Sequence, residues 1–195
     1  MTLFHALGPF AAQAGVVAAP GMVLLTPTSI AHSGTSASIG ANGQVTFTAV
    51  TSLSLNGVFS VDFDNYVVSL RIVGSTDVLI QCRFRASGTD ASGSDYTRQE
   101  LNASSTTVSA NRTTSTQGIL GVASFEQRDG HTFSIYGPHL AQPTAIRSVT
   151  VDGRAGARIN DYAVTHSLST SYDGFTLFPN TGNFTGALTV MGVRS

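Results

Sequence analysis

Few residues of this chain have the type and spacing that catalysis or metal binding needs. Asp62 and Asp64 flank Phe63, so in an extended segment both carboxylates would face the same side. Paired carboxylates can bind calcium or hydrolyse a glycosidic bond. Because no third acidic residue follows nearby, we interpret the pair as part of a turn that leads into a strand beginning at Tyr66.

A second acidic group, Asp90, Asp95 and Glu100, lies in and just after the polar stretch 87–96. This stretch is loosely similar to a calcium-binding loop, although its spacing does not match that of an EF-hand. Glycine turns and Asx turns account for its composition equally well. We expect no metal ion and no cofactor.

The histidines and the cysteine give no site either. No two of the histidines are spaced as metal ligands on one element; they are His5, His32, His131, His139 and His166. We expect His131, His139 and His166 to be surface or interface residues. Cys82 lies inside the apolar run 78–84, where a small buried hydrophobe is expected. A single cysteine cannot form an intramolecular disulfide.

The composition excludes several classes of function. Charged residues make up only 11% of the chain, against about 25% in an average protein. Ten arginines, no lysine and a net charge of −1 provide no basic patch for nucleic acid. The sequence contains no stretch of 18 apolar residues, so no membrane span is predicted. Ser, Thr, Asn and Gly must supply the surface polarity, which fits an extracellular or particle-bound protein better than a cytosolic enzyme.

Short apolar or alternating segments follow one another along the chain, separated by Gly, Ser, Asn and Asp. They predict about ten strands, at 22–25, 44–50, 52–55, 66–73, 78–85, 118–125, 131–136, 145–151, 162–168, 175–178 and 184–193. The Ser- and Thr-rich stretch 88–117 is predicted to be a long loop with one or two short strands. This pattern predicts an all-β, antiparallel β-sandwich that is jelly-roll-like, with an immunoglobulin-like sandwich as the second choice.

The first 61 residues carry no charged side chain, so this third of the chain is expected to pack against something. We predict an apolar attachment segment over residues 1–25 and a sandwich domain over residues 26–195. A helix over residues 3–19 is disfavoured by Gly8, Pro9 and Gly15. A small, uncharged segment of this kind suits burial between subunits.

Several segments together resemble a group of tailed-bacteriophage virion structural proteins, of the minor tail, fibre or head-decoration type. The resemblance covers roughly residues 22–193. Its segments are 26–30, 34–43, 45–47, 53–59, 63–68, 84–90, 95–96, 174–178 and 182–186. Two departures concern the closing strand, where Met191 precedes Gly192 in place of the group's usual aromatic residue, and residues 1–20, which have no counterpart in the group.

The resemblance implies a non-enzymatic protein of the virion that stabilises the particle or contacts the host surface. It implies a homo-oligomer, often a trimer, whose N-terminal segment binds other tail or capsid proteins. The polar stretch 87–117 would suit adaptable contacts on an exposed tip, or it is simply solvated.

Two other functions remain open. A carbohydrate- or receptor-binding module could stack sugars on Tyr96, Tyr136, Tyr162 or Tyr172, although the absence of tryptophan counts against this function. A depolymerase of host glycans would have to use Asp62, Asp64, Asp90, Asp95 or Glu100. No convergent set of acid, base and nucleophile appears among them, and we expect no enzyme.

Overall fold

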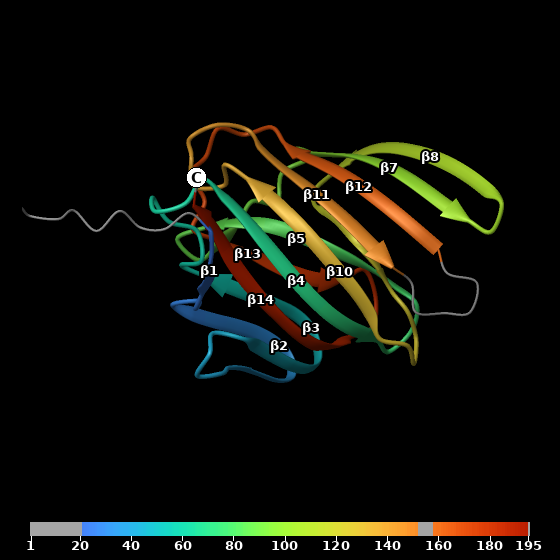
Figure 1. Cartoon of the computed structure of the whole chain (residues 1–195), viewed down its shortest axis with the longest axis horizontal. Coiled ribbons are helices and arrows are strands. Elements are labelled where there is room, and N and C mark those ends of the chain that lie inside the picture. Colours follow the sequence, from blue (N-terminus) through green and yellow to red (C-terminus); the bar gives the residue numbers. More distant parts are fainter. Residues whose placement is uncertain (1–20, 152–157, 195) are drawn as a thin grey trace, which may run out of the picture.

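The computed structural model describes residues 21–151 and 158–194, and these residues form fourteen strands and no helix. The sequence-based prediction of an all-β, antiparallel sandwich is confirmed (Figure 1). No helix in the described part of the chain is long and apolar enough to span a membrane. The strands are β1 (Gly21–Leu25), β2 (Ser29–Ile39), β3 (Val45–Asn56), β4 (Asn65–Gly74), β5 (Val78–Ala86), β6 (Thr89–Asp90), β7 (Tyr96–Ser104), β8 (Thr107–Ser115), β9 (Gly118–Ala123), β10 (Asp129–Tyr136), β11 (Thr144–Val151), β12 (Arg158–His166), β13 (Gly174–Pro179) and β14 (Phe184–Arg194).

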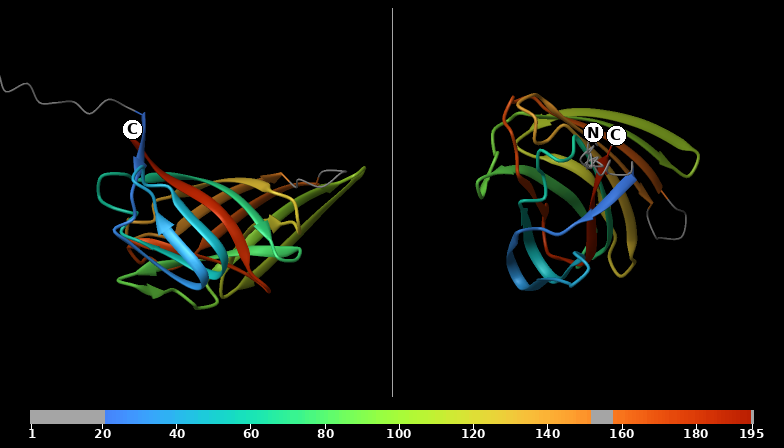
Figure 2. Two further views of the ribbon diagram at one scale, coloured as in Figure 1. Left: turned by 90° about the horizontal axis from the view of Figure 1, so that it is seen from below. Right: turned by 60° about the vertical axis from the view of Figure 1, so that its left-hand side comes forward.

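One continuous sheet curls over to make the two layers (Figure 2). Its strand order is β6-β5-β13-β3-β14-β4-β10-β11-β12-β7-β8, with β2 paired to β3, β1 to β14 and β9 to β5. The first half of β3 pairs with β14 and its last residues pair with β13, so β3 belongs to both layers. The change occurs near Ala49, whose φ of 47° and register shift mark a β-bulge.

The core lies between the two layers and follows from the period-two alternation of the strands. On β4, for example, Tyr66, Val68, Leu70 and Ile72 all point inward and are buried. The first layer contains β5, β6, β9 and β13, and the second runs from β14 through β4, β10, β11, β12 and β7 to β8. Strand β9 lies against β11 and β12 of the second layer. Burial of these apolar side chains supplies the main driving force for folding.

The stretch 88–117 is not the long loop that its composition predicted. Most of it is a hairpin in which β7 and β8, each nine residues long, are joined by the two-residue turn Ser105–Thr106. Strand β2 was also missed, and the predicted strands 44–50 and 52–55 are the single strand β3. Backbone hydrogen bonds hold β8 to β7 and β2 to β3, and these bonds do not require buried side chains.

Strand β1 pairs with β14, so the sheet includes Gly21–Leu25, which the sequence analysis assigned to the attachment segment. Residues 1–20 lie outside the described residues. They include His5 and the range 3–19, for which the sequence analysis disfavoured a helix. The pairs Gly21–Arg194 and Phe184–Gly74 mark opposite ends of β14. The end of the sandwich that holds Gly21 and Arg194 is called the terminal end below, and the opposite end the distal end; Figure 1 labels the C-terminus.

Candidate functional site: an outer apolar strip and an end pocket

Three of the four tyrosines proposed to stack on sugars are in the core. Tyr96, Tyr162 and Tyr172 are no more than 2% exposed, so no glycan can reach their rings in the folded protein. Tyr136, which is 45% exposed, is the one whose ring faces solvent. It pairs with Asn65 at the start of β4, at the terminal end.

The buried tyrosines have structural partners. Tyr96 and Tyr172 both stack on Phe84, with ring centroids 6.3 Å and 5.2 Å away. The hydroxyl of Tyr96 accepts a hydrogen bond from the backbone N–H of Phe84 and donates one to the carbonyl of Ala91, both at 2.9 Å. Burial, aided by the nearby Glu100 carboxylate, raises the pKa of Tyr162. The ring of Tyr96 on β7 therefore packs across the core against Phe84 on β5.

The candidate acids are dispersed, and several are engaged by neighbouring groups. Asp62 lies in the turn before β4, as predicted, and accepts a hydrogen bond from the Ser60 hydroxyl. Asp90 forms an ion pair with Arg85. Glu100 lies 3.5 Å from the guanidinium of Arg98 on its own strand. Among the described residues, no three His, Cys, Asp or Glu gather as a metal site would require.

His131 and His166, each on a strand, are buried, which corrects the expectation of a surface position, whereas His32 on β2 is exposed. His131 is 3% exposed and His166 is fully buried, and burial lowers the pKa of both. His166 stacks on Tyr96 and shares a hydrogen bond with the Tyr172 hydroxyl. The predicted burial of Cys82 is confirmed, and burial raises the pKa of its thiol to about 12.

Towards the distal end, the second layer carries polar residues on its inner face. His131, Thr150 and Asn160 are neighbours across β10, β11 and β12, and all three are buried. The row continues with Asn102 on β7 and Ser109 on β8. Among the residues that the structure describes, neither ring nitrogen of His131 nor the side-chain oxygen of Asn160 has a hydrogen-bond partner.

The outer face of the same strands carries a group of exposed apolar side chains beside the Arg147–Asp161 ion pair. The register places Val151, Ile159, Ala103 and Val108 side by side across four strands, and Val149 and Leu101 belong to the adjacent row. We call Leu101, Val108, Val149, Val151 and Ile159 the outer strip; their exposed fractions run from 41% for Val149 to 67% for Val108. The usual arrangement of apolar inside and polar outside is reversed here, which is typical of a surface that another molecule covers.

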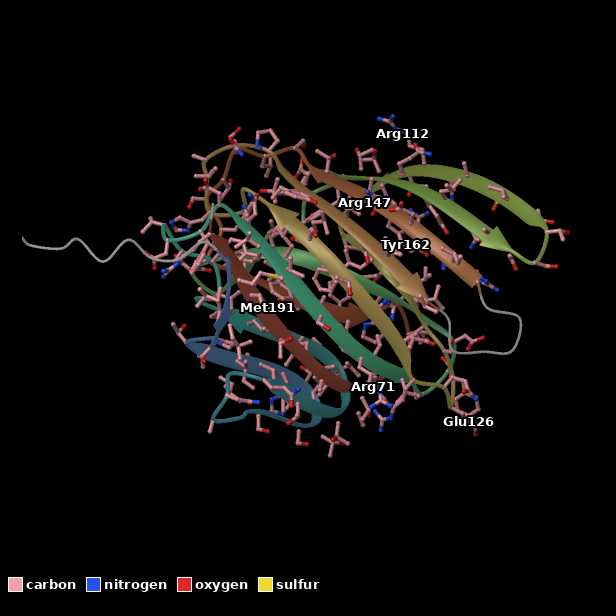
Figure 3. All side chains as sticks on the ribbon, viewed as in Figure 1. Arg71, Arg112, Glu126, Arg147, Tyr162 and Met191 are labelled. Carbon is pink, nitrogen blue, oxygen red and sulfur yellow. The ribbon has the colours of Figure 1, made fainter. Side chains whose placement is uncertain are left out.

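The strip reaches the free edge of β8. In the described part of the chain, this strand pairs with β7 alone, and eight of its nine residues are exposed. Natural edge strands are usually protected by charges, proline or bulges. Strand β8 has one charged residue, Arg112, no proline and an unbroken register. In Figure 3, Arg112 stands away from the hairpin.

A pocket of about 570 Å³ lies at the distal end. Its lining residues, Ser75, Thr76, Asp77 and Phe125, come from the β4–β5 and β9–β10 connections, and we call this site the end pocket. All four are exposed, and the Phe125 side chain is 51% exposed. Figure 3 labels the next residue, Glu126, at this end of the ribbon. The sequence analysis placed Phe125 at the end of the predicted strand 118–125, and a single aromatic residue there gives no signal of a binding site.

Comparisons with known proteins identify no family. No family model matches the chain, and no curated protein matches it. Lectin II from Ulex europaeus aligns over 87% of this chain and 97% of its own, with 9% identity and a TM-score of 0.25. The lectin UEA-II complexed with galactose aligns over 86% and 95%, with 10% identity and a TM-score of 0.22. Likenesses this weak carry no argument about function.

Proposed function

We propose that this chain is a non-enzymatic structural module of a tailed-bacteriophage virion, and that copies of it associate through the β8 edge and the outer strip. The observation that carries the association is the reversed polarity of the hairpin region, where apolar side chains face solvent beside an unprotected edge strand. Surfaces of this kind mark sites of association. The engagement of Asp62, Asp90 and Glu100 by neighbouring groups favours a structural role over catalysis.

A second copy of the chain is the partner that fits this edge. The residues that flank a two-residue hairpin turn normally form a hydrogen-bonded pair, so the N–H groups of Val108, Ala110, Arg112 and Thr114 point away from β7. Two β8 strands that pair antiparallel about Asn111 would match all nine residues, with Arg112 opposite Ala110. No like charges would then meet across the pair.

The test is the mass of the purified chain, measured by light scattering behind size exclusion. We expect about 40 kDa, from two chains of 20.2 kDa, if β8 pairs with β8. A three-membered ring in which β8 pairs with the free edge of β2 would give about 60 kDa, from three chains of 20.2 kDa.

Two variants locate the interface. Ala110→Pro removes an N–H that faces the free edge, and Val108→Lys places a charge on the outer strip. Both changes should disrupt pairing at the β8 edge and reduce the mass to that of one chain. Both variants should still fold, because neither side chain contributes to the core. Ser69→Lys, which adds the same charge to the exposed face of β4, should leave the mass unchanged. A wild-type monomer at all concentrations, or variants that assemble normally, would contradict the proposal.

A further inference from the structure

The end pocket combines an aromatic ring with hydrogen-bonding groups, and it has no part in the proposed association. The ring of Phe125 is half exposed, and the hydroxyls of Ser75 and Thr76 and the carboxylate of Asp77 line the same hollow. The volume of about 570 Å³ lies within the usual range for small-molecule sites, about 300–1,000 Å³. An apolar surface beside a few fixed polar groups is the usual composition of such sites.

The hydrogen bonds around the pocket hold its lining in place. The backbone N–H of Phe125 donates to Asp77 Oδ1 at 2.9 Å, so the carboxylate fixes the residue that carries the ring. The N–H of Gly74 donates to the carbonyl of Ser124 at 3.0 Å. Ser75 is joined to Asn183 of the β13–β14 connection by two hydrogen bonds, N–H to carbonyl at 2.9 Å and Asn183 N–H to Ser75 Oγ at 3.0 Å.

The chain bends immediately after the ring. Glu126 has a φ of 60°, in the left-handed region that residues other than glycine rarely adopt. Such conformations persist only where the surroundings impose them, and they cluster at functional sites. Here the bend follows the residue whose backbone N–H Asp77 accepts, so the backbone position from which the Phe125 ring projects is fixed. A preformed site loses less entropy when it binds its ligand.

We infer that the end pocket binds a neutral pyranose unit of a polysaccharide, with one face of the sugar on Phe125 and its hydroxyls on Ser75, Thr76 and Asp77. A pyranose has an apolar face of C–H groups and a rim of hydroxyls, and the pocket offers a surface for each. A hydroxyl donates to the Asp77 carboxylate in a charge-assisted hydrogen bond. The pocket lies at the distal end, opposite the terminal end where residue 21 enters the sheet, so a chain attached by its N-terminal residues would present it outward.

The experiment is a titration of the 15N-labelled full chain with methyl α-D-glucopyranoside, methyl α-D-mannopyranoside and methyl β-D-galactopyranoside, followed by two-dimensional NMR. For at least one glycoside we expect amide shifts confined to residues 74–77, 124–126 and 183, with a Kd on the order of millimolar. Phe125→Ala should weaken binding at least tenfold, and Phe125→Trp should retain it. Tyr136→Ala removes an aromatic ring of similar exposure at the terminal end and should have no effect.

Three results would overturn the inference: no shift with any of the three glycosides at about 100 mM, which lies far above a millimolar Kd; shifts centred elsewhere; or unchanged binding by Phe125→Ala. The variant should fold, since the ring it removes is half exposed. Repeating the titration with Ala110→Pro separates the two proposals. The end pocket should bind the sugar equally well in this variant, in which association is lost. A failure of sugar binding would therefore leave the proposed association unaffected.

Discussion

At the scale of single residues, His131 is one of two histidines, with His166, whose burial should make the stability depend on pH. It lies under β9, where a Cβ on Gly121 would be 2.7 Å from Nδ1 of the ring. Burial lowers the pKa of His131 from 6.5 to about 4, and the carboxylate of Asp129 only partly opposes this shift. The folded protein therefore holds this imidazole neutral at pH values where the unfolded chain protonates it.

We predict that the free energy of unfolding falls as the pH is lowered from 6.5 to about 4. In that window the unfolded chain binds a proton that the folded chain does not, so stability is lost with falling pH, by up to about 3 kcal/mol. Urea unfolding at several pH values measures it. His131→Gln should flatten the dependence, and His32→Gln, at an exposed position, should not. An unchanged pH dependence in His131→Gln would show that the prediction is wrong.

Residue types alone could not place the tyrosines. Tyr96 lies among serines and threonines in the sequence, which suggested an exposed ring, and yet it stacks in the core. On β7 the inward positions are Tyr96, Arg98 and Glu100, whereas Leu101 faces solvent. A hydrophobic pattern would assign the opposite faces, because the register with β12 decides which side is covered.

At the scale of elements, Arg85 on β5 connects three strands and the β5–β6 turn. Its guanidinium donates to Asn56 Oδ1 at 3.1 Å, Ser54 Oγ at 3.0 Å and Thr176 Oγ1 at 2.9 Å, and it forms the ion pair with Asp90. Its side chain is 12% exposed. Loss of the guanidinium would remove one donor from the buried hydroxyls of Ser54 and Thr176, and it would leave the Asp90 carboxylate without its counter-charge.

We predict that Arg85→Met lowers the free energy of unfolding by about 2–4 kcal/mol, because it removes one partner of a largely buried pair. The matched control is Arg147→Met, which breaks the Arg147–Asp161 pair on the outer face, where the Arg147 side chain is 64% exposed. That change should cost much less, because an ion pair between solvent-exposed groups contributes little to stability. Urea denaturation measures both variants, and equal losses would contradict the assignment of Arg85 as a connector of strands.

The strands that the sequence predicted correctly are those whose inward residues are apolar, such as β4, β5 and β14. Strands β2 and β8 were missed because nearly all of their residues are exposed, and no alternation of burial shapes their sequences. The reversed polarity near the hairpin could not be read from the sequence for the same reason. It depends on which face β9 and the first layer cover.

At the scale of the whole molecule, the antiparallel sandwich follows from many short strands and glycine-rich turns. The two candidate surfaces could not be predicted from the sequence, because each brings together residues far apart in the chain. The outer strip combines β7, β8, β11 and β12, and the end pocket combines the connections after β4 and after β9. Neither grouping has a fixed spacing in the sequence, so only the fold reveals it. The trimer and the attachment role stay predictions.

The last prediction concerns deletion of residues 2–20. The shortened chain should fold with unchanged thermal stability, because β1 still begins at Gly21 and pairs with β14. It should also retain the mass of the full chain, because the outer strip and the β8 edge lie outside the deleted segment. Incorporation of a tagged chain into purified virus particles should be lost, if this segment attaches the sandwich to them. Normal incorporation of the shortened chain would refute the attachment role, and a change in mass would show that association needs the N-terminal residues rather than β8.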